Sequence, residues 1–279
     1  MAIILGNLMN FCGILVWGSL VESASQSIDD TNLVNNKPVY YYVNKVGLDS
    51  PNFTNAGQII LVNCSYSIIS GLNLSNTSIG IDLKYSNSNT ISGNTLNNNY
   101  YGIGLIYCDH NTLQGNFANN NTYGITLSFS NENMVFENTA ANNTNFGIAT
   151  DRCNNNIISR NIANDNSYGI VLVFSNSSVS TNNIIQGNSI YGAWIFGGIQ
   201  STQNYFFENH FSMNNLHAFD DGILNFWDNG TIGNYWEDYS GVDANDDGIG
   251  DTPYYINGSA GSVDNYPIVP LSQKFRIPS

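Results

Sequence analysis

Basic residues are scarce in this chain, and their scarcity excludes one large class of function. Lys and Arg number 7 against 21 Asp and Glu, so the formal net charge is −14. Binding to nucleic-acid phosphates needs a basic patch or stripe, and the sequence has none. The same deficit disfavours an acidic polysaccharide as substrate, because the few cations are scattered: Lys37, Lys45, Lys84, Arg152, Arg160, Lys274 and Arg276.

Charged residues and prolines are few, and helical patterns are short. Only 10% of the residues are charged and 6 are Pro, while 26 are Gly; this composition excludes a charged disordered tail and a collagen. No apolar pattern with helical spacing continues beyond one turn. We therefore expect a single domain with one elongated core and no transmembrane helix.

The first 24 residues are apolar and end in Ser23-Ala24-Ser25, yet no Lys or Arg precedes Lys37. A signal peptide should begin with a cationic region. Gly13-Ile14 and Ser19 instead fit the repeat described next, so we expect a repeat unit here, with a cleaved or anchoring segment as the alternative. A chain that begins within a repeat is typical of a fragment or a shortened copy of a longer protein.

One pattern returns four times between Asn89 and Asn176, at intervals of 22 or 23 residues. Each unit opens with a six-residue segment bounded by Asn and continues with a Gly-Ile pair that follows Tyr or Phe. Such a period indicates a solenoid, because one unit is too small to bury its own apolar face. The segments are Asn89–Asn94, Asn111–Asn116, Asn133–Asn138 and Asn156–Asn161, and the pairs begin at Gly102, Gly124, Gly147 and Gly169.

Apolar residues alternate within each unit, as in Ile103, Leu105 and Tyr107. Alternation is the period of a strand with one buried face, and Asn, Gly, Ser and Thr between the runs form turns. A leucine-rich repeat would need a helical half, which is missing. The pattern predicts an all-β parallel β-helix of about 22 residues per coil, with a rise of about 4.8 Å per coil.

Small side chains and asparagines recur at fixed positions of the unit, and we expect each set to form a column along the axis. Successive cysteines would lie two coils, roughly 9.6 Å, apart, which is too far for a disulfide. We therefore expect free, buried thiols, with Cys12 in the first coil, and Asn amides that bond coil to coil. The columns are Cys64, Ser86, Cys108, Ser130, Cys153 and Ser175, and Asn94, Asn116, Asn138 and Asn161.

Two stretches interrupt the repeat. Residues 28–57 contain a strand-like run at 37–43 and then turn residues, which predicts a loop or lateral hairpin. A loop of about four extra residues near 177–182 would account for the longer interval from Asn156 to Asn183. We assign β-helix coils to residues 1–225 and a C-terminal cap, part of the same domain, to residues 226–279.

Large aromatic residues gather where the repeat ends. A solenoid needs a cap over its last coil, and this is the simplest role for these rings. Stacking of sugars on the rings is the alternative. The candidate carbohydrate-binding residues are Trp227, Tyr235, Trp236 and Tyr239.

The most specific short motif follows the aromatic segment and has the order of a calcium loop. Oxygen-bearing side chains occupy loop positions 1, 3, 5 and 9, and Gly248 occupies the sharp turn at position 6. The predicted ligands are Asp243, Asn245, Asp247, the carbonyl of Ile249, and Asp251. Tyr254 stands where a bidentate Glu is usual, so we expect a structural Ca²⁺ whose shell is completed by Asp264, or by Glu237 and Asp238.

The Asn-rich repeat, the segment 36–44, the run 233–239, the acidic loop and Asp264-Asn-Tyr-Pro267 together resemble the NosD-type β-helix proteins. These belong to the carbohydrate-binding and sugar-hydrolysis repeat group and are abundant as archaeal surface proteins. The resemblance covers nearly the whole chain. It implies a right-handed parallel β-helix in an extracellular or cell-surface location, and it brings the family's description as periplasmic copper-binding proteins.

Copper and catalysis both have weak support among the residues. Copper prefers Cys, Met and His, and only His210, His217 and Met213 could approach one another, so we do not expect a copper site. Glycoside hydrolysis needs two facing carboxyl groups, but Asp109 and Asp151 occupy different positions of the repeat. The pair Asp220-Asp221 resembles the paired acids of some β-helix hydrolases, but the Gly and His signature that surrounds them there is missing.

These observations favour an exported, non-catalytic carbohydrate-binding or structural module of the cell envelope, with a polysaccharide or envelope glycan as partner. A polysaccharide-acting enzyme (a hydrolase, lyase or epimerase) is the first alternative, and a NosD-like copper-binding accessory protein is the second.

Overall fold

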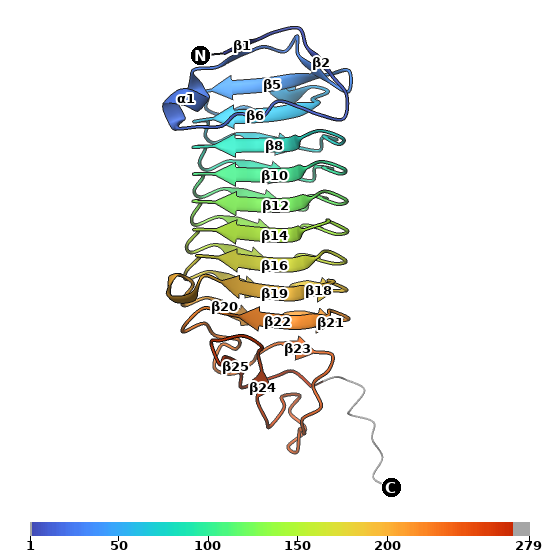
Figure 1. Cartoon of the computed structure of the whole chain (residues 1–279), viewed down its shortest axis with the longest axis vertical. Helices are drawn as coiled ribbons and strands as arrows, with labels where there is room; N and C mark the ends of the chain where they lie inside the picture. Colours follow the sequence, from blue (N-terminus) through green and yellow to red (C-terminus); the bar gives the residue numbers. More distant parts are fainter. Residues whose placement is uncertain (1, 270–279) are drawn as a thin grey trace.

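The computed structural model describes residues 2–269, which wind into a right-handed parallel β-helix (Figure 1). The coils stack along one axis, with the N-terminal residues at one end and the C-terminal residues at the other. This confirms the predicted fold class and its period of about 22 residues. In the described part of the chain, no helix has the length and apolar character needed to cross a membrane.

The first face of the solenoid is a sheet of 11 strands, here called the long sheet. Its pairs are parallel with the exception of β4 and β5. Its strands are β2 (Leu8–Met9), β4 (Leu33–Val34), β5 (Lys37–Val43), β6 (Gln58–Val62), β8 (Ile79–Lys84), β10 (Tyr101–Ile106), β12 (Tyr123–Ser128), β14 (Phe146–Asp151), β16 (Tyr168–Val173), β19 (Tyr191–Phe196) and β22 (Leu216–Asp220).

Two further faces complete each coil. The second is a sheet of 7 strands, β7 (Ile68–Ser70), β9 (Thr90–Ser92), β11 (Thr112–Gln114), β13 (Met134–Phe136), β15 (Ile157–Ser159), β17 (Val179–Thr181) and β20 (Tyr205–Phe207). The third consists of isolated bridges that lead into β18 (Ile184–Gln186), β21 (His210–Ser212) and β23 (Tyr235–Trp236). The remaining elements are β1 (Ile3–Ile4), β3 (Ser27–Ile28), β24 (Tyr254–Tyr255), β25 (Val263–Asp264), α1 (Leu20–Ala24) and the short 3₁₀ turns Ser50–Phe53 and Gly198–Gln200.

The core is built from columns of identical residues, because parallel pairing sets each residue beside its counterpart in the next coil. Ile81, Ile103 and Ile125 are paired in register and are completely buried. Each fully buried Ile contributes roughly 1.5–3 kcal/mol relative to an exposed one. The core therefore extends along the whole axis.

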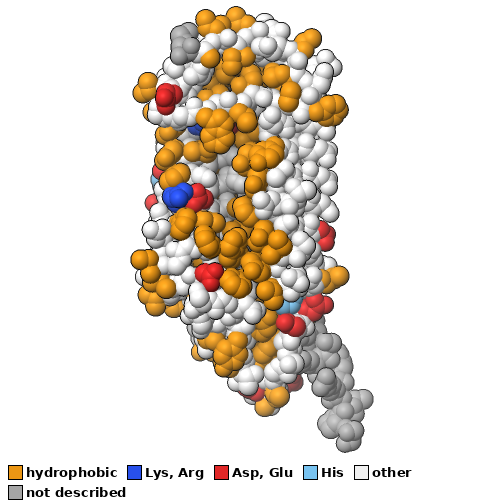
Figure 2. Space-filling model, in the orientation of Figure 1, with side chains coloured by type: hydrophobic (Ala, Val, Ile, Leu, Met, Phe, Trp, Pro, Cys, Tyr) orange, Lys and Arg blue, Asp and Glu red, His pale blue; other side chains and the backbone are white. Residues whose placement is uncertain are grey.

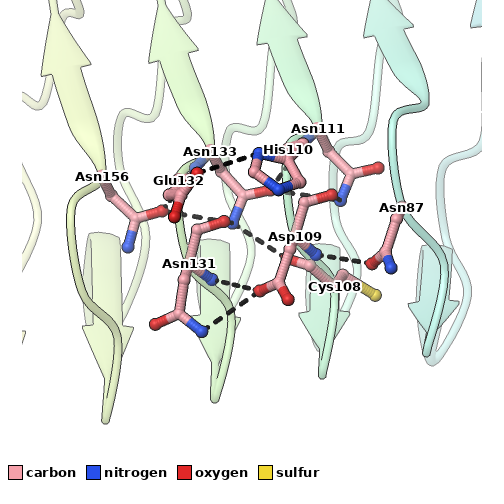
Figure 3. Close-up of polar contacts among 9 residues, drawn as sticks. All are labelled: Asn87, Cys108, Asp109, His110, Asn111, Asn131, Glu132, Asn133 and Asn156. Atoms are coloured by element: carbon pink, nitrogen blue, oxygen red, sulfur yellow. Dashed lines mark hydrogen bonds and ion pairs between the residues drawn. The ribbon is translucent and has the colours of Figure 1, made fainter.

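Asparagine ladders run beside this core, as predicted (Figure 3). Asn111 Nδ2 donates to Asn133 Oδ1 (3.1 Å), and Asn133 Nδ2 donates to Asn156 Oδ1 (3.1 Å). Each acceptor oxygen also receives the backbone N–H of the preceding coil. All three amides are buried, so these bonds satisfy polar groups that water cannot reach.

The column of Cys and Ser is also present. Cys64, Cys108 and Cys153 are buried free thiols, as expected, and backbone N–H groups of neighbouring coils donate to the latter two. Burial raises the pKa of Cys108 and Cys153 to about 12, which keeps both neutral. Cys12 is exposed, so the expectation of a buried thiol was wrong for this residue.

The N-terminal segment forms only part of the coil that was expected. Strands β1 and β2 pair in parallel with β3 and β4, and Asn7 Nδ2 donates to Asn32 Oδ1 (2.8 Å), but the stretch from Gly13 to Ser19 does not follow the repeat. Ser19 is the N-cap of α1 and pairs with Glu22 in a capping box, so it is outside the small-residue column. Residues 12–18, here called the strap, lie against the long sheet and its preceding turns instead. Gly13 N donates to Ser78 Oγ (2.9 Å), and Ile14 N donates to Gln58 Oε1 (2.8 Å).

The first interruption of the repeat agrees in part with the prediction, and the second does not. Residues 37–43 form a strand, β5, which makes an antiparallel hairpin with β4 and also pairs in parallel with β6, so it is part of a coil. Near residues 177–182 there is no extra loop, because Asn161 N donates to Asn183 Oδ1 (2.9 Å), one ordinary coil away. The prediction failed because Ser178 replaces the usual ladder Asn. The added residues lie after β19, around the 3₁₀ turn Gly198–Gln200.

Candidate functional site

Three of the four rings proposed to stack on sugars are buried. Trp227 and Trp236 are completely inaccessible, and Tyr239 is nearly so. The indole N–H of Trp227 donates to Asp220 (3.1 Å), and that of Trp236 donates to Asp264 (2.8 Å). Buried rings cannot stack on a ligand, so the sugar-binding role is not supported for these three residues. They cover the last coils; residues 270–279 of the predicted cap lie outside the described residues.

Asp264 is a buried carboxylate that ties the cap together. Its oxygens accept from Asn234 N (2.7 Å), Trp236 Nε1 (2.8 Å) and Tyr266 N (3.0 Å). Burial raises its pKa to about 6, and these donors oppose the rise. The folded state therefore binds the proton more tightly than the unfolded state, and this contribution to stability is lost as the pH rises through about 6.

We predict that Asp264→Asn lowers the unfolding free energy, relative to wild type, by more at acidic pH than at neutral pH. Wild type gains stability from Asp264 as the pH falls from about 7.5 to about 4.5, and the amide cannot titrate. The difference in unfolding free energy between the two proteins should therefore widen by on the order of 2 kcal/mol over this range. Chemical denaturation at both pH values measures it; a constant difference would contradict the raised pKa.

Tyr235, the fourth predicted ring, is half-buried and stacks on His210, with ring centroids 4.2 Å apart. His217 is buried, and its Nε2 lies 3.3 Å from Asp238 Oδ1. Burial lowers the pKa of both histidines, while Asp238 and Glu237 oppose this at His217. Among residues 2–269, no three His, Cys, Asp or Glu side chains are grouped to hold a metal.

The acidic loop adopts the sharp turn that its motif predicts. Gly248 has φ +91°, and its N–H donates to Asp243 Oδ2 (2.9 Å). Asp247 Oδ1 accepts from Ile249 N (2.8 Å), and Asp251 Oδ2 accepts from Ala244 N (2.7 Å). The side chain of Asn245 donates to Asp247 Oδ2 (3.0 Å). The loop oxygens thus satisfy the loop's own N–H groups, an arrangement that Ca²⁺ would have to reorganise.

The carboxylates expected to complete the calcium shell have other partners. Asp264 is held in the cap, and Glu237 Oε2 accepts from Met213 N. Asp238 lies against His217 and accepts a hydrogen bond from Tyr254. Only the five loop ligands remain for Ca²⁺, and calcium binding by this loop stays a prediction.

We predict weak, structural calcium binding. With so few ligands the dissociation constant should lie near the millimolar range typical of extracellular modules. Addition of about 10 mM CaCl₂ should raise the melting temperature by a few degrees, and Asp243→Asn should remove the rise. The same concentration of MgCl₂ is the control, and an equal shift in the variant would contradict a site in this loop.

A groove on the outer face of the long sheet was not predicted. It has a cavity volume of about 400 Å³ and follows the axis from β8 to β16. Figure 2 shows apolar side chains bordering a hollow on this face. We call it the aromatic groove. Its floor consists of outward-facing strand residues, including Gly104, Thr126, Ser128 and Ala149.

Aromatic side chains form one wall of the groove. Tyr101 and Tyr123 stack with centroids 4.8 Å apart, and Phe146 continues the row. These rings precede the Gly-Ile pairs of successive coils. In-register pairing brings them into contact, and each such ring pair adds about 0.5–1.5 kcal/mol beyond area burial.

The opposite rim is a second row at the end of each long strand. Tyr107 and Phe129 stack at 4.8 Å, and the Arg152 guanidinium lies between Phe129 and Phe174, 5.2 and 5.1 Å from their centroids. The four residues have positive φ, between 47° and 57°. Bulky residues seldom adopt this conformation. This backbone conformation costs roughly 1–3 kcal/mol per residue, and the stacking of side chains between coils offsets that cost.

Large side chains of the strap line the N-terminal end of the groove. These are Leu15 and Trp17, and Lys84 Nζ lies 4.9 Å from the centre of the Trp17 ring. Beyond the other end of the groove, Trp194 stacks on Tyr168 with centroids 5.2 Å apart.

Two ion pairs lie at the groove. Lys84 Nζ is 3.2 Å from Asp82 Oδ1, and both side chains are less than 5% exposed. Arg152 Nη1 donates to Asp151 Oδ2 (2.8 Å) at a half-exposed position. Burial raises the pKa of Asp82 and of Asp151, and the neighbouring cation opposes the rise in each case.

Asp82 Oδ1 has an acceptor capacity that the described residues leave unfilled. Its contact with Lys84 satisfies the distance of an ion pair, but no hydrogen bond of acceptable geometry reaches this buried oxygen. Buried polar atoms are rarely left in this state. The Lys84 ammonium is the partner of this oxygen, and solvent does not reach it.

The carboxylates do not form a hydrolytic pair. Asp82 and Asp151 are three coils apart, about 14 Å or more, whereas glycosidases need about 5–9.5 Å. Asp109 Oδ1 accepts a hydrogen bond from the backbone N–H of Asn131, and the backbone N–H of Asp109 donates to Asn87 Oδ1 (Figure 3). It belongs to an outer turn ladder and, as predicted, does not converge with Asp151.

Asp82 and Lys84 were not predicted as groove residues, although the sequence contains a signal for them. In β8 the Gly-Ile line is followed by Asp82 and Lys84, where the other units have mostly small or apolar residues. Alternation assigns both to the outer side of a strand whose inner residues are Ile81 and Leu83. Burial of this outer pair depends on Trp17 of the strap, which no periodicity predicts.

Comparison with solved structures identifies other β-helices. A mutant of the periplasmic alginate epimerase AlgG has a TM-score of 0.57 and 18% identity, covering 80% of this chain and 56% of that chain. Two further matches have lower TM-scores. An alginate lyase from Paenibacillus sp. str. FPU-7 has a TM-score of 0.44 and 13% identity, covering 70% of this chain and 77% of that chain. The Dettilon tailspike protein has a TM-score of 0.47 and 13% identity, covering 82% of this chain and 53% of that chain. At such identities the likeness shows the fold alone, and this chain spans little more than half of the epimerase.

No curated protein matches the sequence. The family model described as "Periplasmic copper-binding protein (NosD)" matches residues 22–241, which is most of the chain. The match includes the strands that carry the aromatic groove and ends just before the acidic loop. The chain therefore belongs to the NosD family of parallel β-helix proteins.

Proposed function

We propose that this chain binds a glycan along the aromatic groove and does not act on it chemically. One observation carries the proposal: an aromatic-walled hollow of about 400 Å³ follows the solenoid axis and has buried polar groups in its floor. Ligand sites are typically concave, mostly apolar and furnished with a few polar groups. An elongated groove suits an extended chain of sugar units.

The walls suit sugar rings in particular. Tyr101, Tyr123 and Phe146 repeat once per coil, at about 4.8 Å, a spacing similar to the length of a pyranose unit. Their side chains offer apolar edges to the C–H faces of sugars, while Thr126 and Ser128 offer hydroxyl groups in the floor. Each repeated coil would contact one sugar unit.

The absence of a close carboxylate pair in the groove favours binding over hydrolysis. The enzyme alternative, a lyase or epimerase, is favoured by a different observation: Asp82 and Asp151 have raised pKa values and both line the groove. Perturbed acids in clefts occur at catalytic sites and also in structural ion pairs. Each acid here has a cationic partner, which supports the structural role.

The proposed location is the periplasm or the cell surface. The family description as periplasmic supports it, and an envelope glycan is the corresponding partner. A purely structural role in the envelope is the alternative if no glycan binds.

A glycan array tests the proposal. The purified chain should retain a defined set of glycans, and retention should be equal with calcium and with chelator, because the acidic loop lies outside the groove. Isothermal titration of the strongest glycan should give a saturable constant. Failure to retain any glycan in either buffer would leave the chain as an envelope scaffold, and release of reducing ends or unsaturated products would favour the enzyme.

A further inference from the structure

We infer that the aromatic groove selects uncharged glycans over polyuronates; the inference rests on the proposed glycan-binding function. One cation, Lys84, lines the groove and a second, Arg152, lies at its rim, and each is already paired with a carboxylate of the protein. A neutral sugar supplies hydroxyl donors, and a uronate adds a negative charge for which no free cation is present.

The ion pairs make the floor close to neutral. Lys84 lies 3.2 Å from Asp82, and Arg152 donates to Asp151 at 2.8 Å. Among the described residues that line the groove, Lys84 is the sole Lys or Arg. Arg152 is held between two rings at the rim. A sugar carboxylate would therefore have to compete with an existing partner.

Such competition is unfavourable inside the groove. Removing a carboxylate from water without a new partner is strongly unfavourable. A uronate beside Asp82 or Asp151 would in addition face a like charge, and the net charge of −14 adds a longer-range repulsion. A hydroxymethyl group at the same position of the sugar carries neither cost.

The strap reinforces the closed ion pair at this end of the groove. Leu15 and Trp17 line the groove beside Lys84 and Asp82, and both charged side chains are almost fully buried. A ligand in the groove therefore meets a cation whose partner is already in place.

The test uses pairs of glycans that differ only in charge. Oligosaccharides of mannuronan, glucuronan and galacturonan are each compared with their carboxyl-reduced products at about pH 7.5, by isothermal titration at low and high salt. We expect at least one reduced product to bind on the order of tenfold or more tightly than its acidic parent, with little salt dependence. Equal or tighter binding of the acidic parent would overturn the inference.

Freeing a cation should change the preference. Asp151→Asn leaves Arg152 charged, because guanidinium does not lose its proton in proteins. The affinity for polyuronates should rise on the order of tenfold. Glu132→Gln removes the same charge at an exposed position outside the groove, and it should change the affinity less than about twofold. Asp82→Asn, with a free Lys84, is the second variant if the first does not fold.

The outcomes separate the two proposals. If no member of any pair binds, the glycan-binding function itself fails. If binding occurs but the acidic members are preferred, glycan binding stands and the neutral selectivity is wrong. An equal gain in Asp151→Asn and Glu132→Gln would also overturn the selectivity argument, because net charge and not the groove would then determine the preference.

Discussion

The Ala149→Trp variant is expected to lose about 100-fold or more of its glycan affinity, with little change in thermal stability. Ala149 lies on the floor of the aromatic groove and faces outward. Trp194 occupies the same column two coils further on. At position 194 the long sheet already accommodates an indole between flanking rings. An indole at position 149 should therefore fill the aromatic groove without disturbing the core.

Ala149→Ser is the matched control, because it keeps the groove open and should bind within about twofold of wild type. Affinity is measured by isothermal titration and folding by circular dichroism and melting temperature. Undiminished binding by a folded Ala149→Trp protein would place the glycan site elsewhere on the molecule.

The second large effect concerns the asparagine ladder. Asn116→Ala should lower the unfolding free energy by about 3–5 kcal/mol. The side chain of Asn116 accepts from the backbone and side chain of Asn94 (3.1 and 3.0 Å) and donates to Ile91 O and Asn138 Oδ1 (both 2.9 Å). Truncation leaves buried polar groups in two neighbouring coils without partners, at about 1–3 kcal/mol each.

Asn215→Ala is the control for this prediction, since Asn215 is exposed and outside the ladders. Urea denaturation should show a change of less than about 0.5 kcal/mol there. Similar losses in both variants would mean that the ladder amides contribute no more than a surface asparagine.

The repeat made most of the fold predictable. In-register columns follow directly from the period, because parallel coils bring residues one period apart into contact. The Asn ladder at Asn94 and Asn116 and the buried thiol of Cys108 were therefore predicted correctly. The position of the insertion was not, because Ser178 stands where the ladder has Asn, and counting from Asn to Asn skipped a coil.

The N-terminal segment shows a second limit of periodicity. Gly13-Ile14 and Ser19 match the repeat by spacing, yet Ser19 caps a short helix and Ile14 bonds to the side chain of Gln58. Local capping by Ser19 and Glu22 was sufficient to form the helix. The strap then covers Lys84, a contact with Trp17 that no repeat predicts.

The candidate site was predicted less well than the fold. Core positions are nearly constant from coil to coil, but groove positions vary from Asp82 to Gly104, Thr126 and Ala149, so no motif marks them. The aromatic cap was identified as a cluster, and its burial depends on Asp264, almost thirty residues away from Trp236. The acidic loop has its predicted turn, and its calcium remains to be measured.

Hydroxyl-radical footprinting with the strongest glycan of the array tests the central claim most directly, because it reports the exposure of individual side chains. When the glycan is saturating, we expect Tyr101, Tyr123 and Phe129 in the aromatic groove to be protected from oxidation. Tyr66 and Met213, exposed outside the groove, should react at unchanged rates. Protection of Tyr66 or Met213 with no change at the groove rings would contradict the proposed site.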